Sequence, residues 1–265
     1  MANQNSKSTE IPKHICLFCT NHANSGEHIW PQWMHPLIRT KGLNHLNTRG
    51  LPIRVVGPVV FSPQINMKMI SGAPQTRKMK YVCGECNNGW MSQIEEKAKP
   101  ILIEILNGNP INLNREQMRV VSDWAMLKTI VLDRDDLSMQ SIPQNYRHSF
   151  RKNRDFLPNT HIYLAKYKGG DWKVAFRHFA FGIFSWDTSN LTIRLPPNTQ
   201  ISTFAVEKMV LQVRTSIVPD LEIDTSLRPF TSSFVKLYPC SANSIDWPPK
   251  QPVTDPMLNI VANQI

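Results

Sequence analysis

The hydrophobic pattern of the chain predicts two long helices near its middle. From Trp90 to Leu106, apolar residues recur every three or four positions, as they do along one face of a helix. Pro100 lies inside this run and is expected to kink the helix or divide it in two. The sequence NGNP at residues 107–110 should end it, and a second apolar face of helical period extends from Arg115 to Leu132.

Short apolar runs rich in β-branched residues predict strands on both sides of these helices. Residues 54–61 and 78–83 have this character before the first helix. After the second helix, turn sequences such as KGGD and DTSN separate further runs, which cover residues 160–168, 172–186, 191–195 and 201–215. Strands joined by short turns favour an antiparallel sheet, packed here by one or two helices.

Together these elements predict an α+β chain of two modules. Its 265 residues exceed the usual size of one compact domain. We expect residues 13–109 to form the module that carries the chemistry, and residues 110–238 to form a domain of helix and antiparallel sheet. Residues 1–12 are polar and lack periodicity, as in a flexible arm, and the proline-rich segment 239–265 is expected to be an irregular tail.

The positive charge of the chain indicates which kinds of molecule it could bind. A formal charge of +10 and a pI near 9.5 favour a polyanion, with nucleic acid as the first hypothesis and a merely basic protein as the alternative. No apolar run reaches the roughly 20 residues that span a bilayer. The first residues also lack the apolar segment of a signal peptide. We therefore expect no membrane partner and a cytoplasmic location.

The cysteines have the spacing of a metal site. Four of the five form two CxxC pairs, Cys16 with Cys19 and Cys83 with Cys86, whereas Cys240 stands apart. In a reducing compartment this pattern favours metal over disulfides, with free thiols as the alternative. Zinc prefers a tetrahedral shell of thiolates, and each pair can supply two of them. The four cysteines are therefore predicted to hold one structural zinc ion in a closed site.

Three segments around these pairs form a longer pattern. They are CLFC at residues 16–19, EHIWP at residues 27–31 and CGECNNGW at residues 83–90. This pattern resembles the HNH endonuclease family, in the subgroup whose ββα-metal motif is braced by two CxxC knuckles. The resemblance covers roughly the first 100 residues. It implies an N-terminal ββα-metal nuclease module with a structural zinc.

The resemblance also implies roles for three residues. His28 would be the general base that takes a proton from the attacking water, while Glu27 and Asn87 would hold one divalent ion against the scissile phosphate. Carboxylate and amide oxygens suit a hard ion such as Mg²⁺ or Mn²⁺, and a neutral histidine can accept a proton at physiological pH. The middle asparagine of the motif has two candidates, Asn44 and Asn47, and the sequence does not distinguish them.

Two groups of basic residues are candidates for contact with phosphates. One precedes the second knuckle, and the other is a dense cationic run in the predicted second module. A charge run is usually a solvated face, but the nuclease interpretation favours phosphate contact. The two groups are Arg77, Lys78 and Lys80, and Arg147, Arg151, Lys152 and Arg154.

Other aromatic residues and histidines are expected to be structural. Three tryptophans could stack on bases, but we favour a place in the core beneath the zinc site for Trp30, Trp33 and Trp90. The remaining histidines near the pattern are expected to be ordinary surface or core residues: His14, His22, His35 and His45. His178 is predicted to be a half-buried residue of the sheet.

The sequence thus predicts a metal-dependent endonuclease that hydrolyses phosphodiester bonds, with DNA as the favoured substrate. Zinc would be the structural ion and Mg²⁺ or Mn²⁺ the catalytic one. Products with 5′ phosphate and 3′ hydroxyl follow from the family resemblance. A phage-defence or mobile-element setting, and a homodimer or partner protein, are further hypotheses. Two alternatives stay open: a zinc-knuckle module that binds DNA or RNA without cutting it, and a regulatory interaction subunit.

Overall fold

The computed structural model describes residues 14–39, 44–49, 53–54, 66–71, 73, 76–135, 140–170, 174–184 and 197–263. The predicted arm, the predicted strand 191–195 and most of the predicted strand 54–61 lie outside the described residues. The rest of the chain combines helices with mainly antiparallel strands, so the predicted α+β class is confirmed. Within this part, no helix has the length and apolar character needed to span a membrane.

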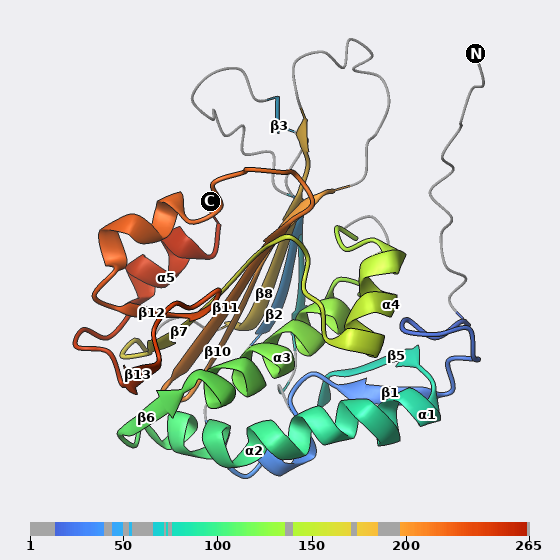
Figure 1. Cartoon of the computed structure of the whole chain (residues 1–265), viewed down its shortest axis with the longest axis horizontal. Coiled ribbons are helices and arrows are strands. Elements are labelled where there is room, and N and C mark those ends of the chain that lie inside the picture. The colour runs from blue at the N-terminus through green and yellow to red at the C-terminus, as the bar shows by residue number, and fades with distance from the viewer. Residues whose placement is uncertain are drawn as a thin grey trace.

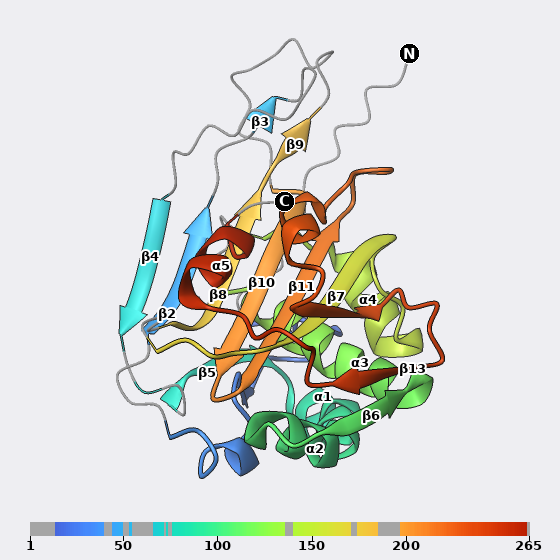
Figure 2. The same ribbon diagram turned by 90° about the vertical axis from the view of Figure 1, so that its left-hand side faces the viewer.

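A seven-stranded sheet forms the centre of the molecule (Figure 2). All neighbouring strands are antiparallel except β8 and β2, which run parallel. In sheet order the strands are β12 (Phe234–Tyr238), β7 (Asn159–Lys166), β11 (Met209–Ser216), β10 (Thr199–Val206), β8 (Val174–Phe181), β2 (Asn44–Arg49) and β4 (Asn66–Ser71). The run predicted at 201–215 therefore folds back on itself as β10 and β11.

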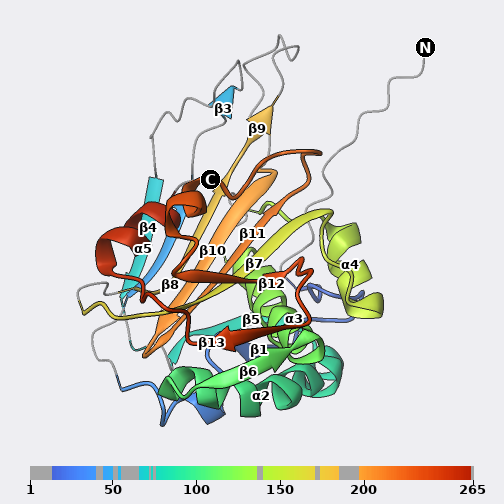
Figure 3. The same cartoon turned by 60° about the vertical axis from the view of Figure 1, so that its left-hand side comes forward.

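Helices cover both faces of this sheet (Figures 1 and 3). On one face, α3 (Arg115–Leu132) packs through the main core. On the opposite face lie α5 (Asp255–Val261) and a 3₁₀ helix at Thr225–Phe230, with a smaller core of their own. All eight residues of β10 and all eight of β11 are buried. The central strands therefore lack the alternation of exposed and buried positions found in one-sided sheets.

Both predicted long helices are present. α3 begins at a capping box in which Asn114 and Gln117 exchange side-chain and backbone hydrogen bonds. α2 (Ser92–Asn107) ends at Gly108, whose φ of 78° lies in the left-handed region that favours glycine. Of the two outcomes expected at Pro100, a kink or a division of the helix, division does not occur, because α2 continues through it. Pro100 is exposed, while the buried side of α2 packs on α3 and holds the helix together.

A second, two-stranded sheet lies beside the start of α2. β1 (Ser25–His28) and β5 (Lys78–Val82) pair antiparallel, with Glu27 opposite Met79 and His28 opposite Lys78. From β5 the chain continues directly into α1 (Gly84–Cys86), a π-helical turn (Asn87–Met91) and α2. Two strands and a helix are thus brought together from segments about fifty residues apart in the sequence.

The main sheet and the main core both extend across residue 109, the predicted boundary between the modules. β2 and β4 come from the N-terminal side of that boundary, yet β2 pairs with β8 from the other side. The main core likewise combines Trp30 and Ile94 with Trp124 and Phe204. The two predicted segments therefore share one sheet and one core.

The segment predicted to be an irregular tail contains regular structure. β13 (Ser244–Trp247) pairs with β6 (Ile111–Asn114), and α5 follows β13 in the sequence. The prediction of an irregular tail is wrong for these residues. The sequence did not reveal them, because short elements between prolines have no detectable hydrophobic period. The remaining elements are α4 (Gln144–Asn153), a 3₁₀ helix at Gln32–Met34, and the parallel pair β3 (Ile53–Arg54) and β9 (Ile183–Phe184).

A buried polar network joins α3, α4 and the main sheet. Asp133 is fully buried and accepts hydrogen bonds from Ser141 and, at 2.8 Å, from Nη2 of Arg147. Its Oδ1 lies 3.5 Å from Nε2 of His178, which is itself buried in β8. Burial alone would raise the pKa of Asp133, but the interaction with His178 and the charge of Arg147 outweigh it and lower the pKa. Asp133 is therefore ionised in the folded protein.

Replacing Asp133 with asparagine should lower the free energy of unfolding by about 3–5 kcal/mol at neutral pH, because Arg147 would lose its buried counter-ion. Since the pKa of Asp133 is depressed on folding, its contribution is present above the ordinary value of 3.8 and is lost as the pH falls below it. Urea unfolding at neutral pH and at about pH 3 checks this. The difference in the free energy of unfolding between the variant and the wild type should be smaller in acid. An equal difference at both pH values would contradict the conclusion that Asp133 is ionised and stabilising in the folded protein.

Candidate functional site

Four cysteines form a buried cluster next to the small sheet. Cys16 and Cys19 precede β1, while Cys83 and Cys86 lie at the two ends of the first turn of α1. Their sulfur atoms all lie within 4.8 Å of one another, and those of Cys19 and Cys83 are 3.6 Å apart. Zn–S bonds of about 2.3 Å place the sulfurs of a tetrahedron about 3.8 Å apart. The cluster is therefore compatible with a structural zinc ion.

The backbone around the cluster favours thiolates. The N–H of Phe18 donates to Sγ of Cys16 at 3.5 Å, and the N–H of Cys86 donates to Sγ of Cys83 at 3.4 Å. A side-chain hydrogen bond with Cys86 lowers the pKa of Cys16 to about 4, while the same hydrogen bond raises the pKa of Cys86 and burial raises that of Cys19. Two backbone N–H groups therefore already donate to cluster sulfurs, as they do to metal-bound thiolates, and Cys16 is the thiol most readily ionised.

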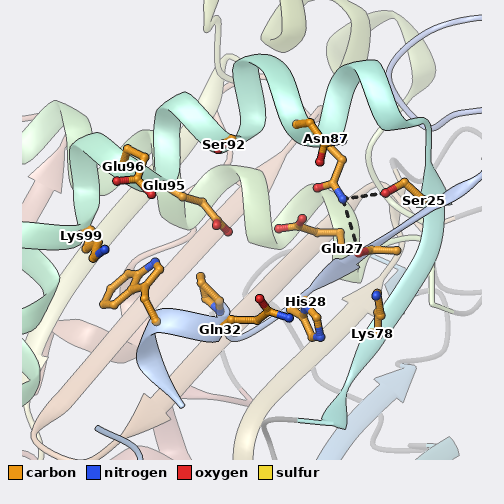
Figure 4. Close-up of a pocket in the computed structure, with 14 residues that line it drawn as sticks. Ser25, Glu27, His28, Gln32, Lys78, Asn87, Ser92, Glu95, Glu96 and Lys99 are labelled. Carbon is orange, nitrogen blue, oxygen red and sulfur yellow. Dashed lines mark hydrogen bonds between the residues drawn. The ribbon is translucent and has the colours of Figure 1, made fainter. Parts of the chain in front are cut away.

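A pocket of about 500 Å³ opens between the end of β1 and the exposed side of α2 (Figure 4). Glu27 and His28 line it from β1, and Asn87 lines it from the π-helical turn directly after the second knuckle. Lys78 lines it from β5, opposite His28. The three residues that the sequence pattern singled out therefore share one pocket, within a few residues of the cysteine cluster.

The side chain of Asn87 is held in one orientation. Its Nδ2 donates to Oγ of Ser25 at 2.8 Å and to the carbonyl oxygen of Gly26 at 3.4 Å. Figure 4 shows its carboxamide oxygen on the side away from Ser25. The hydrogen bonds thus use the donor atoms of Asn87 and leave an acceptor oxygen at the pocket.

His28 has the protonation state expected of a base. Partial burial and the positive charge of Lys78 lower the pKa of His28 below its ordinary value of 6.5. Its ring lies 5.6 Å from that of His35, whose Nε2 is 2.9 Å from the carbonyl oxygen of Trp30. His28 is therefore neutral at physiological pH and able to accept a proton.

The sequence pattern missed two residues of this site, Lys128 and Glu95. The Nζ of Lys128 is ion-paired with the carboxylates of Glu27 and Glu95 and donates to the carbonyl oxygen of His28 at 2.8 Å. Lys128 is fully buried, and Glu27 is 5% exposed. One signal was present: Lys128 lies four residues after Trp124 and four before Leu132, on the apolar face of α3. A lysine in such a position requires a buried partner.

Comparison of this chain with protein-family models, with curated proteins and with solved structures found no match. The chemistry of the site is therefore deduced from its residues.

Of the basic residues predicted to contact phosphates, one lines the pocket and a second lies two residues further along the same strand. Lys78 and Lys80 are exposed on the same face of β5, two residues apart, and Lys78 lines the pocket. Arg151 and Lys152 lie in the last turn of α4, and Lys152 is exposed. These four side chains stay candidates for contact with a phosphate backbone.

The other three predicted phosphate contacts have protein partners. Arg147 is 1% exposed and pairs with Asp133, so its prediction as a surface phosphate ligand is wrong. Its burial follows from the position of α4 against the main core and beside Asp133, which a run of basic residues does not reveal. Arg77 is ion-paired with Asp135. The guanidinium of Arg154 lies 4.5 Å from the ring centre of Trp90.

The remaining residues considered from the sequence lie outside the pocket or at its edge. Asn44 and Asn47 belong to β2 in the main sheet, so neither is part of the β1–β5 sheet, and the choice between them stays open. Trp30 is fully buried, as predicted, and Trp33 and Trp90 pack against the same core while partly buried. His14 and His22 are exposed, His45 lies in β2, and His178 is fully buried instead of half-buried.

Proposed function

We propose that this chain is a metal-dependent endonuclease of the HNH type that hydrolyses phosphodiester bonds, with DNA as the favoured substrate. The observation that carries the proposal is the pocket shared by a neutral His28 and the oxygen ligands of Glu27 and Asn87. Its position beside two strands, a helix and a cysteine cluster supports the same function. The net charge of +10 favours a polyanionic substrate.

The ligands in the pocket fit a divalent ion such as Mg²⁺ or Mn²⁺. Glu27 offers a carboxylate, and the hydrogen bonds of Asn87 leave its carbonyl oxygen as the ligand atom. Both are oxygen ligands of the kind that hard cations prefer. When bound, the ion would supply positive charge to the phosphate during the reaction.

The residues of the chain would contribute the proton transfer and the positioning. His28 would remove a proton from a water molecule as the water oxygen forms a bond to phosphorus. The bond from phosphorus to the 3′ oxygen breaks, and the leaving oxygen takes a proton from solvent. Lys78, on the rim of the pocket, would hold a neighbouring phosphate by its charge. The products are a 5′ phosphate and a 3′ hydroxyl.

Cleavage of supercoiled plasmid tests the proposal. Zinc-quantified protein should nick or linearise the plasmid with Mg²⁺ or Mn²⁺ and leave it intact with EDTA, while keeping about one zinc per chain. Brief EDTA treatment followed by a zinc assay separates loss of the catalytic ion from loss of the structural one. Intact plasmid and intact RNA in every metal, from folded and zinc-loaded protein, would contradict the proposed activity.

The rate of cleavage should depend on pH through His28. Because the pKa of His28 is depressed, the neutral base is present at neutral pH and is lost only as the pH falls below the ordinary value of 6.5. The plot of log kcat/KM against pH should therefore rise with a slope of about one and level off below about pH 6.5. A rate that keeps rising through about pH 8 would exclude His28 as the titrating base.

A nucleic-acid-binding module that does not cut is the second candidate. The ion pair between Lys128 and Glu27 favours it, because one ligand of the divalent ion already has a cationic partner. In that case a DNA duplex should bind with an affinity that falls steeply with salt, while plasmid remains intact.

A further inference from the structure

Lys128 is the most deeply buried charge of the pocket region. It comes from α3, whereas the two carboxylates that it contacts come from β1 and α2. Its three protons have three oxygen partners: Glu27, Glu95 and the carbonyl oxygen of His28. The ammonium group is therefore enclosed by three oxygen atoms, two of them from carboxylates.

This arrangement sets the charge that a divalent ion meets. Figure 4 shows the carboxylates of Glu27 and Glu95 pointing toward one another across the pocket. Two carboxylates without Lys128 would carry two negative charges in a partly buried site, which is a strong binding site for a divalent cation. The carboxylates of Glu27 and Glu95 and the ammonium group of Lys128 together carry one net negative charge, and one acidic and two basic residues on the rim add no further negative charge. Another anion is then needed to balance a doubly charged ion.

We propose that Lys128 is a positioning residue that holds Glu27 and Glu95 and makes tight binding of the divalent ion depend on the phosphate of the nucleic acid. This inference rests on the proposed function, because it assigns Glu27 to the ion. Lys128 repels the ion in the free protein, and the arriving phosphate supplies the missing negative charge. The site therefore assembles fully only on its substrate. Lys128 itself touches neither the water nor the scissile bond.

The test measures the affinity of zinc-loaded protein for Mn²⁺ by electron paramagnetic resonance, in the absence of nucleic acid. It compares two substitutions, one that removes a positive charge from the site and one that removes a negative charge. Lys128→Met removes the repelling charge and should bind Mn²⁺ at least about tenfold more tightly than the wild type. Glu95→Gln keeps the pair of Lys128 with Glu27 but removes one negative charge, and should bind Mn²⁺ at least about tenfold more weakly. Lys99→Met, a charge removal at the rim of the same pocket, is the matched control and should change the affinity far less.

A merely structural role for Lys128 predicts weaker Mn²⁺ binding in both variants, because Glu27 would lose its position. That result in folded protein, or an unchanged affinity in Lys128→Met, would overturn the inference. If Lys128→Met does not fold, Glu95→Gln still tests the charge balance, because its side chain is 20% exposed, and unchanged or tighter Mn²⁺ binding in this variant would overturn the inference. Plasmid cleavage by the wild type is scored separately. If the wild type does not cleave plasmid but the variants shift Mn²⁺ affinity as expected, only the nuclease proposal is refuted. If the wild type cleaves plasmid but the Mn²⁺ affinities do not shift as expected, only the role of Lys128 is refuted.

Discussion

Replacing His28 with alanine should lower kcat for plasmid cleavage by about 10²–10⁴-fold, the range expected when a general base is removed. The protein should keep its zinc and its thermal stability, because the ring is only partly buried and makes no side-chain hydrogen bond to the part of the chain that the structure describes. The measurement is single-turnover cleavage with saturating Mg²⁺, alongside zinc content and Tm. The KM for DNA should change little, since the base acts in the chemical step.

His14→Ala is the matched control for this substitution. His14 is an exposed histidine beside the first knuckle, and its ring stacks on that of His22, at 6.1 Å between centres. Its removal should leave kcat within about twofold of the wild type. Equal activity of the His28→Ala variant and the wild type would show that another group takes the proton, and the mechanism proposed for this pocket would be wrong.

Replacing Cys83 with serine should release the zinc ion and lower the Tm by about 10 °C or more. Loss of a structural metal costs several kcal/mol, and each kcal/mol shifts the Tm by about 2–4 °C in a chain of this size. Cys83 also caps α1, since its sulfur accepts the N–H of Cys86. The end of β5 and the start of the helix that carries Asn87 should therefore loosen, and cleavage should be lost with the metal.

The fifth cysteine supplies the control. Cys240 is half-buried and lies outside the cluster, so Cys240→Ser should keep about one zinc per chain and nearly the wild-type Tm. Zinc is measured by atomic emission on dialysed protein, and unfolding by a thermal scan of the same samples. A Cys83→Ser variant that retains stoichiometric zinc and an unchanged Tm would show that the four thiols do not form one metal site.

Local sequence patterns predicted those features of the structure that depend on residues close together in the sequence. The period of apolar residues is enough to locate α2 and α3, because a helix repeats within four residues. The CxxC pairs likewise predicted the four-cysteine cluster, since two thiols in one turn already have the spacing that a metal needs. The adjacency of Glu27 and His28, and the position of Asn87 after the second pair, gave the sequence pattern its three pocket residues.

Errors arose where an element's environment depends on segments distant in the sequence. Arg147 looked like part of a solvated cationic run, but α4 packs against the main core and buries Arg147 beside Asp133. Pro100 was expected to kink or divide the helix, but tertiary contacts of the neighbouring turns keep α2 undivided. The charge or backbone chemistry of a residue is local, whereas its burial is a property of the whole fold.

The sequence by itself determined the chemistry available to this protein: four thiols for a metal, a histidine next to a carboxylate, an asparagine at a helix start and an excess of positive charge. Only the tertiary structure decided how these groups are charged and where they face. It places Lys128, about a hundred residues after Glu27, between two carboxylates, because α3 packs on α2 and its Lys128 side chain reaches β1. Burial of an ammonium group is stable only beside such partners, so this contact could not be inferred before the helices and strands were placed together.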